Sequence, residues 1–269
     1  MPTPEIALIT GASSGLGAEF ARQLAAQGYH LILVARRQAR LLALAAELEQ
    51  THAITAEVLV ADLARPDDIE RVKQRLGQVD KLSLLVNNAG FGTAGNFADI
   101  DLNPQLDMVH VHVLAAIHLC RAALPGMIAR GRGAIINVSS IAGLAPLPGN
   151  VTYCATKAYL NMFSEALQIE LAGTGVQVQA LCPGFTITEF HDSPEFAGRS
   201  RSRSPNLLWL SAAEVVTASL RALKKDRVRC VPGLQYKFLA MLIHLTPAFI
   251  RQWLLVHRRH LRRMLRPNA

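Results

Sequence analysis

Apolar runs rich in strand-forming residues alternate with helix-like patterns along the first 230 residues of the chain. These runs are almost continuously apolar, which is typical of strands that are buried on both faces of a parallel sheet. The expected strands are Glu5–Thr10, His30–Ala35, Thr55–Ala61, Leu82–Asn87, Gly133–Ser139, Val176–Leu181 and Arg227–Val231. The expected helices are Gly15–Gln27, Ala39–Glu49, Pro66–Gly77, Pro104–Met127, Val151–Gly173 and Ser211–Lys224.

This order of elements predicts an α/β protein with a Rossmann-type doubly wound parallel sheet of about seven strands, helices on both faces and a C-terminal helical extension. Folds of this class often reach the length of this chain undivided. Two stretches fall outside the alternation, namely Thr186–Leu210, rich in Ser, Pro and Arg, and the tail after Pro232. We therefore expect a Rossmann-fold domain over residues 1–233 and a basic amphipathic extension over residues 234–269.

The positive charge of the chain belongs to this extension. The formal net charge is +8, yet residues 227–269 hold nine Lys/Arg and no Asp/Glu, so the preceding residues sum to −1. Arginines and leucines are interspersed near the end of the extension. They are Arg258, Arg259, Arg262, Arg263 and Arg266, with Leu254, Leu255, Leu261 and Leu265. Two interpretations stay open, a helix docked on the domain with a solvated cationic face and a peripheral contact with an anionic membrane surface.

Other partners and compartments are less favoured. No base-stacking aromatic set accompanies the arginines, so we expect no nucleic acid. The apolar stretch from Phe238 to Ile250 is too short to span a membrane and is interrupted by His244 and Pro247. The four cysteines show no zinc-like spacing, and no signal peptide is visible. We expect reduced structural thiols, no metal site and a cytoplasmic protein, with membrane contact only at its periphery.

A glycine-rich turn follows the first expected strand and opens the first expected helix. It reads Thr10-Gly11-Ala12-Ser13-Ser14-Gly15-Leu16-Gly17. Gly11 allows the tight turn, Gly15 lets the backbone approach a pyrophosphate, and Gly17 permits close packing of helix on strand. The helix N-terminus then presents free N–H groups and its positive dipole end to phosphates. The spacing is not that of the general dinucleotide fingerprint, but its strand–turn–helix context predicts a dinucleotide site.

The end of the second expected strand indicates which dinucleotide. It reads Leu33-Val34-Ala35-Arg36-Arg37, with no acid at 34–37, where an NAD-selective protein would carry one for the ribose hydroxyls. Arg36, and after it Arg37, can instead pair with a 2′-phosphate through charge-assisted forked hydrogen bonds. A solvated pair of arginines is the alternative. We predict NADP(H) as the cofactor.

Three residues further along the chain suggest the chemistry. Tyr153 and Lys157 are four residues apart in an expected helix, which puts phenol and ammonium on one face. Because a nearby cation favours phenolate, we expect the pKa of Tyr153 to fall from about 10 toward the range of a general acid or base. Ser140 can donate its hydroxyl to a substrate carbonyl oxygen. Together with a hydride carrier, these residues predict a carbonyl/alcohol oxidoreductase.

Taken together, these motifs resemble the classical short-chain dehydrogenase/reductase family across residues 5–231. The markers are the glycine turn, Asp62-Leu63, Asn87-Asn88-Ala89-Gly90, Asn137-Val138-Ser139-Ser140, Tyr153-xxx-Lys157 and Pro183-Gly184 followed by Thr188. The resemblance implies Ser140, Tyr153 and Lys157 as catalytic residues, with Ser140 preferred to Ser139. The implied cofactor-binding residues are Gly11, Ser13, Ser14, Gly15, Leu16, Gly17, Arg36, Arg37, Asp62, Leu63, Asn88, Ala89, Gly90, Tyr153, Lys157, Pro183, Gly184, Thr186 and Thr188.

One position departs from the family pattern. The family often has an active-site asparagine thirteen residues before the proline that ends the fourth helix. Here that proline is expected at Pro125, and the corresponding residue is His112. Three roles stay open for this histidine: holding a water relay behind Lys157 through its carbonyl, transferring a proton through its ring, or packing within a helix. We include His112 among the candidate catalytic residues.

Substrate and assembly follow only loosely from the resemblance. The segment after Pro183 is most similar to bacterial reductases of unassigned substrate and less similar to long-chain 3-oxoacyl and hydroxysteroid reductases. Apolar walls would come from Leu144, Ala145, Leu147, Pro148 and the segment Phe185–Trp209. Such walls favour a lipophilic ketone or 3-oxoacyl substrate, and closure of the core by the same residues is the alternative. The resemblance also implies a homodimer at least. We favour a dimer over a tetramer, because the tail after Pro232 can cover the edge of the last strand. The alternative function is a non-catalytic, NADP-binding redox sensor on the same fold.

Overall fold

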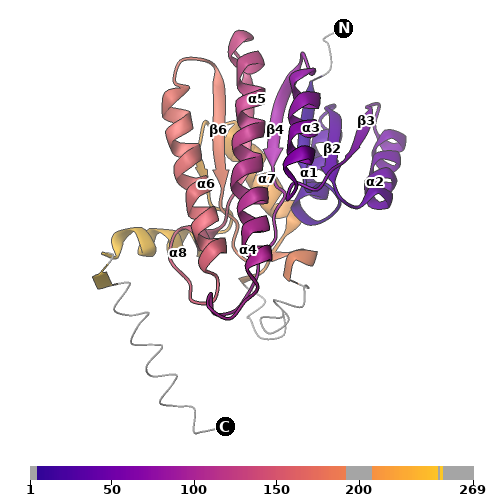
Figure 1. Ribbon diagram of the computed structural model, residues 1–269. Coiled ribbons are helices and arrows are strands. Elements are labelled where there is room, and N and C mark those ends of the chain that lie inside the picture. The colour runs from indigo at the N-terminus through magenta and orange to yellow at the C-terminus, as the bar shows by residue number, and fades with distance from the viewer. Residues whose placement is uncertain (1–4, 192–207, 248, 251–269) are drawn as a thin grey trace.

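The structure, a computed structural model, describes residues 5–191, 208–247 and 249–250. Seven parallel strands form one sheet in the order β3-β2-β1-β4-β5-β6-β9 (Figure 1). The strands are β1 (Ile6–Thr10), β2 (His30–Ala35), β3 (Ala56–Val60), β4 (Leu82–Asn87), β5 (Gly133–Val138), β6 (Val176–Leu181) and β9 (Arg229–Cys230). The predicted fold class is confirmed, and the sequence placed every one of these strands within two residues of its bounds.

Helices cover both faces of the sheet. The helices on one face are α1 (Gly15–Ala25), α2 (Gln38–Thr51) and α7 (Ala212–Leu223), and those on the other are α3 (Pro66–Gly77), α5 (Ala115–Ala129) and α6 (Val151–Glu170). In Figure 1, α5 and α6 lie in front of the sheet and α7 lies behind it. Within β1, Ala7 and Ile9 join one core cluster and Leu8 joins the other. Burial on both faces therefore explains why the strands are almost continuously apolar.

The order of strands creates a crevice where the site can form. β1 lies between β2 and β4, so the chain builds the sheet first toward β3 and then, starting at β4, toward the opposite edge. Loops after β1 and β4 leave in opposite directions at such a switch point, and ligands of open α/β sheets bind there. The hydroxyl of Thr10, the last residue of β1, donates to the carbonyl oxygen of Val86 in β4 at 3.3 Å.

The expected single helix Pro104–Met127 is wrong in one respect. α4 (Leu102–Val109) passes into a π-helical turn, η1 (His110–Leu114), before α5 begins. In that turn the N–H of Ala115 bonds to the carbonyl of His110, five residues earlier. One extra residue in a long apolar helix hardly changes its periodicity, so the sequence pattern did not reveal the interruption.

The same helical stretch is long and apolar enough to cross a membrane by length and composition alone. Its apolar residues are used inside the protein, however. Leu119 and Met127 are fully buried, and α5 packs against α3 and β4. The composition of this stretch is therefore explained by packing in the core.

Helix α8 (Leu234–Leu245) begins at the first residue of the predicted extension. A single buried residue, Tyr236, anchors it to the domain. The Tyr236 hydroxyl donates to the Leu208 carbonyl at 2.5 Å and accepts from the N–H of Phe185 at 2.9 Å. A Cβ on Gly184 would lie 2.1 Å from the Tyr236 ring, so the glycine makes room for this anchor. The extension thus packs on a loop that lines the cleft described next.

Candidate active site

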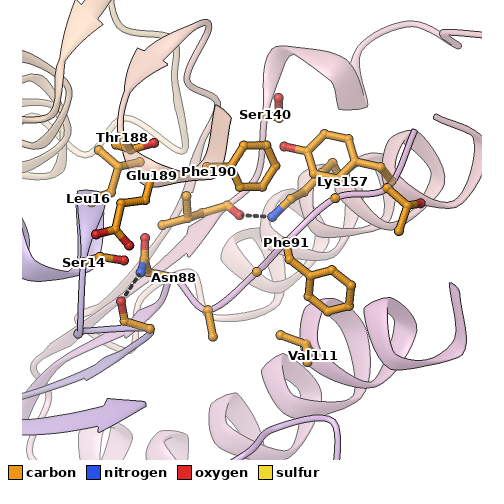
Figure 2. A pocket seen from close by; sticks show the side chains of 18 of the residues that line it. Ser14, Leu16, Asn88, Phe91, Val111, Ser140, Lys157, Thr188, Glu189 and Phe190 are labelled. Atoms are coloured by element: carbon orange, nitrogen blue, oxygen red, sulfur yellow. Dashed lines mark hydrogen bonds between the residues drawn. The ribbon is translucent and has the colours of Figure 1, made fainter. Parts of the chain in front are cut away.

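A cleft of about 950 Å³ opens at the carboxyl ends of the strands, where β1 and β4 meet. Its walls come from the glycine turn, the end of β2, the loop after β4, the start of α6 and the segment that follows β6 (Figure 2). All but two of the predicted site residues line this cleft. The two exceptions are Gly17 and His112, which lie behind its wall.

Contacts between β1 and β4 hold the glycine turn in place. The Thr10 hydroxyl accepts from the backbone N–H groups of Asn88 at 2.9 Å and Ala89 at 3.0 Å. The Asn88 side-chain amide donates to the Thr10 carbonyl at 2.9 Å and the Gly11 carbonyl at 3.3 Å. A Cβ on Gly17 would lie 2.2 Å from the Gly11 carbonyl oxygen. The role predicted for Gly17, close packing behind the turn, therefore fits its position outside the cleft wall.

The N-terminus of α1 faces the cleft with its first N–H groups unsatisfied by a cap. Ser14 occupies the N-cap position, but its side chain makes no capping bond. Gly15, with φ of +54°, adopts a left-handed conformation, and a Cβ there would lie 3.2 Å from the Thr188 side chain. The glycine thus keeps open the space between the turn and Thr188. An anion such as a pyrophosphate fits this place because free N–H groups and the helix dipole both favour negative charge.

Arg37 makes more contacts in the site than Arg36, although the sequence pattern placed Arg36 first as the partner of a 2′-phosphate. Its guanidinium donates to the hydroxyl oxygens of Ser13 at 3.1 Å and Ser14 at 2.6 Å, and to the Glu189 carboxylate at 2.9 Å. The Arg36 side chain is 68% exposed and lies 4.0 Å from the Asp62 carboxylate. Both arginines line the cleft, so both remain candidates for a phosphate contact.

Sequence reasoning missed Glu189. It follows β7 (Thr186–Ile187), in the short helix η3 (Glu189–His191), and bonds to both Arg37 and Arg40. Hydrogen bonds from these two arginines lower the pKa of the Glu189 carboxyl below its usual value. The partners stand 152 and 149 residues away, and a single acid after a strand carries no local signal for such a contact.

Lys157 is buried on α6 beside Tyr153. Its ammonium donates to a backbone carbonyl, that of Val138, at 2.8 Å (Figure 2). The same ammonium lies 5.7 Å from the centre of the Tyr153 ring. Burial lowers the pKa of Lys157 to about 7, because a charged ammonium loses its hydration inside the protein. The helical spacing of four therefore brings the two groups together as predicted.

The predicted fall in the pKa of Tyr153 is wrong for the protein without bound cofactor or substrate. Burial raises the pKa of Tyr153 to about 12, and a hydrogen bond with Ser140 acts in the opposite direction without overcoming it. Desolvation dominates because Lys157 is itself buried, which disfavours the charge that was expected to stabilise a phenolate. A tyrosine with a raised pKa keeps its proton at neutral pH and can act as a proton donor.

The two neighbouring serines have different tasks. The Ser139 hydroxyl donates to the Lys157 carbonyl at 2.7 Å, which ties the end of β5 to α6. The Ser140 hydroxyl oxygen accepts from the N–H of Ala142 at 3.1 Å and caps the short helix η2 (Ile141–Gly143). The Ser140 side chain is thereby held at the cleft wall (Figure 2). Both serines line the cleft, so the preference for Ser140 over Ser139 stays a prediction.

His112 is only 2% exposed, and both of its ring nitrogens have partners. The N–H of Phe91 donates to Nε2 at 3.2 Å, so Nε2 is an acceptor and the ring proton lies on Nδ1. Nδ1 is 2.9 Å from the Thr156 hydroxyl oxygen, and that hydroxyl in turn donates to the Tyr153 carbonyl at 3.0 Å. Burial and the neighbouring Lys157 hold the pKa of His112 well below its usual value. The ring is therefore neutral and links the loop after β4 to α6.

Comparison with known proteins identifies the family. The family model described as short chain dehydrogenase matches residues 5–195. The chain belongs to this family. It is therefore an oxidoreductase that interconverts C=O and CH–OH groups with a nicotinamide cofactor, and the resemblance drawn from the motifs is confirmed at this level.

Individual relatives of this short-chain dehydrogenase have different substrates. A very-long-chain 3-oxoacyl-CoA reductase from Laccaria bicolor is 38% identical over 187 residues, which cover 68% of this chain but only 55% of that protein. A short-chain dehydrogenase from Sphingobium yanoikuyae, solved in complex with NADPH, is 33% identical, with a TM-score of 0.79 and 98% of each chain covered. The bulky-bulky ketone specific alcohol dehydrogenase from Comamonas testosteroni is 30% identical, with a TM-score of 0.76 and coverage of 98% and 96%.

Solved relatives differ in cofactor as well. A short-chain dehydrogenase from Burkholderia phymatum in complex with NAD is 25% identical, with a TM-score of 0.79 and coverage of 90% of this chain and 93% of that one. The choice between the two dinucleotides must therefore be argued from the residues of this chain.

In this short-chain dehydrogenase, the neutral ring of His112 predicts how the pH profile of kcat/KM responds to substitution of this residue. Because burial and the neighbouring Lys157 lower the pKa of His112, the ring stays neutral over the pH range of an ordinary assay. It therefore neither gains nor loses a proton in that range. His112→Asn should therefore leave the positions of both limbs of the kcat/KM pH profile unchanged. The amide can keep only part of the bridge to Phe91 and Thr156, so kcat/KM should fall by about tenfold across all pH values. Disappearance of a limb in this variant would instead assign the ring a role in proton transfer.

Proposed function

We propose that the protein is an NADP(H)-dependent oxidoreductase that interconverts a lipophilic ketone and its secondary alcohol, with Tyr153 as general acid and base. The observation that carries this proposal is the group formed at the wall of the cleft by buried Lys157 and by Tyr153 and Ser140, which are both half-buried. Burial keeps the phenol protonated at neutral pH, which is the form that reduction requires.

The residues would divide the work of reduction among them. A dinucleotide held there would supply hydride, a hydrogen with its bonding electron pair, for the carbonyl carbon. The Ser140 hydroxyl orients the carbonyl oxygen, and Tyr153 gives its proton to that oxygen, which becomes the alcohol. Lys157 would bind the nicotinamide ribose and orient the Tyr153 phenol. The glycine turn and the N-terminus of α1 would bind the pyrophosphate.

The preference for NADP(H) over NAD(H) is supported by charge. No acid stands at 34–37 to bind ribose hydroxyls, while Arg36 and Arg37 both line the cleft. The NADPH complex of the Sphingobium yanoikuyae relative agrees with this choice. A forked guanidinium suits a 2′-phosphate because it can give two charge-assisted hydrogen bonds.

A lipophilic substrate is supported by the apolar part of the cleft. Its apolar lining includes Phe91, Ile141, Leu147, Phe185 and Phe190. Of the residues expected as walls after Ser140, Leu147 lines the cleft, whereas Leu144, Ala145 and Pro148 do not. Residues 192–207 of the expected wall Phe185–Trp209 lie outside the described residues.

The substrate proposal is tested by NADPH oxidation with a panel of aromatic, steroid and 3-oxoacyl carbonyl compounds. Turnover with bulky ketones or 3-oxoacyl esters and little with small aldehydes would support it. Tight NADPH binding without turnover on any carbonyl would favour the alternative, a non-catalytic redox sensor.

We also propose a homodimer, built by pairing of the long helices. α6 carries apolar side chains on its outer face, with Met162 68% exposed and Ile169 77% exposed. Two copies of α6 and of the α4–α5 stretch, packed about a twofold axis, would bury this face in an isologous four-helix interface. Light scattering at micromolar concentration should give the dimer mass, and a monomer would refute this assembly.

A peripheral membrane contact of this otherwise cytoplasmic protein is our proposal for the C-terminal extension. α8 leaves Leu234 80%, Phe238 59% and Leu245 69% exposed, and the sequence after Ile250 adds six arginines and no acid. Apolar insertion would combine with about 1 kcal/mol per cation near an anionic surface. The full chain should bind anionic liposomes at low salt, and this binding should weaken as the salt concentration rises.

Removal of residues 251–269 gives the matched control for this membrane prediction. The shortened chain keeps Tyr236, the anchor of α8, so its NADPH affinity should not change. Its binding to anionic liposomes should disappear at low salt. If the full-length protein does not bind such liposomes at low salt, the extension is instead an element that docks on its own domain.

A further inference from the structure

Asn150 has a buried amide nitrogen with no hydrogen-bond partner. The residue is 5% exposed, and its Nδ2 atom has no partner within the described part of the chain. Buried side-chain donors are nearly always satisfied, because leaving one unpaired costs the full loss of its hydration. An exception of this kind calls for a ligand or a bound water to complete it.

Asn150 also lies at the right place to meet a substrate. Other buried polar atoms without partners occur on Asn87, His110 and Asn161, but among these residues Asn150 is the one that lines the cleft. It is the N-cap of α6, three residues before Tyr153. Residues three apart on a helix lie on one side, with Cβ atoms about 5–6 Å apart. The amide and the phenol can therefore contact neighbouring atoms of one small molecule.

The side chain is not used for the helix itself. Asparagine is common at N-caps because its oxygen accepts from the first N–H groups, but the Asn150 side chain makes no capping bond. The backbone of Asn150 does the local work, since its N–H donates to the Leu147 carbonyl and its carbonyl accepts from the N–H of Cys154. The side-chain amide is thus available to the cleft.

We propose that Asn150 is a specificity-determining residue whose amide donates a hydrogen bond to a second oxygen of the substrate, next to the ketone that Tyr153 protonates. The ligand class is a ketone with a neighbouring carbonyl acceptor, as in a 3-oxoacyl ester or thioester, followed by an apolar chain. This inference rests on the proposed function. A polar group built to pair with a substrate discriminates strongly against an analogue that lacks the pairing atom, because the group then stays buried and unpaired.

The test compares two substrates of the same chain length. Ethyl 3-oxooctanoate carries the second carbonyl, whereas undecan-6-one has methylene groups in place of the ester C=O group and the ester chain oxygen. Asn150→Leu has a similar volume but no donor. It should lower kcat/KM for the ester about tenfold and leave kcat/KM for the plain ketone unchanged or raised. Taking the variant-to-wild-type ratio for each substrate cancels their different intrinsic reactivity.

Two further variants keep the result interpretable. Leu147→Ala changes an apolar residue of the same cleft and should lower kcat/KM for both substrates by a similar factor. Asn150→Ala should repeat the selective loss if leucine disturbs folding. The NADPH dissociation constant and the thermal midpoint of each variant, which should stay near the wild-type values, report on the fold.

Equal losses on both substrates in the Asn150 variants would overturn the inference, since they would mean that the amide holds structure or a water. A wild-type protein that reduces undecan-6-one but not the ester would also overturn it, while leaving the proposed ketone reductase standing. Wild-type protein that binds NADPH and reduces neither substrate would contradict the proposed substrate class, and the inference with it.

Discussion

Tyr153→Phe should lower turnover by about 10² or more while NADPH binding survives. The substitution removes only the phenolic proton, which would go to the carbonyl oxygen during reduction. Burial raises the pKa of Tyr153 to about 12 in the protein without cofactor, so the wild-type residue carries that proton at neutral pH. The measurement is the rate of NADPH oxidation at saturating ketone, together with the dissociation constant for NADPH.

Tyr159→Phe is the matched control for this prediction. Tyr159 lies on the same helix, half-exposed and with its ring stacked on Phe163, and does not line the cleft. Loss of its hydroxyl should leave turnover near the wild-type rate. A Tyr153→Phe enzyme as fast as wild type would end the assignment of Tyr153 as the general acid.

Arg36→Ala should weaken NADPH binding about thirtyfold and leave NADH binding nearly unchanged. A charge-assisted contact to the 2′-phosphate is worth about 2 kcal/mol, and NADH lacks that phosphate. Arg37→Ala should weaken both cofactors, because Arg37 also holds Ser13 and Ser14 of the glycine turn. Dissociation constants for both dinucleotides, measured at fixed salt, check the two expectations.

Arg40→Ala removes the same charge from the same region, at a residue that does not itself line the cleft. Arg40 pairs with Glu189. Its loss should change NADPH affinity much less than the loss of Arg36. If Arg36→Ala and Arg40→Ala have equal effects, the preference reflects general positive charge and not a contact with the 2′-phosphate.

Local patterns predicted the scaffold of this site well. The bounds of β2, β4 and β6 agree to the residue, because buried parallel strands are short, apolar and bounded by turn residues. The π-turn around His112 was missed, since one added residue barely alters an apolar helix. The outer walls were predicted only in part, because a side chain in a loop points where its neighbours allow.

The sequence by itself determined the strand segments, the glycine turn and the placing of Tyr153 and Lys157 on one helical face. Each of these follows from residues close together in the chain, through strand burial, turn geometry and helical spacing. Tertiary structure alone decided the rest. Burial reversed the expected pKa shift of Tyr153, contact with Phe91 and Thr156 fixed the proton of His112, and Glu189 met Arg37 across 152 residues. Desolvation and long-range pairing depend on which distant segments the fold brings together, and no local pattern encodes them.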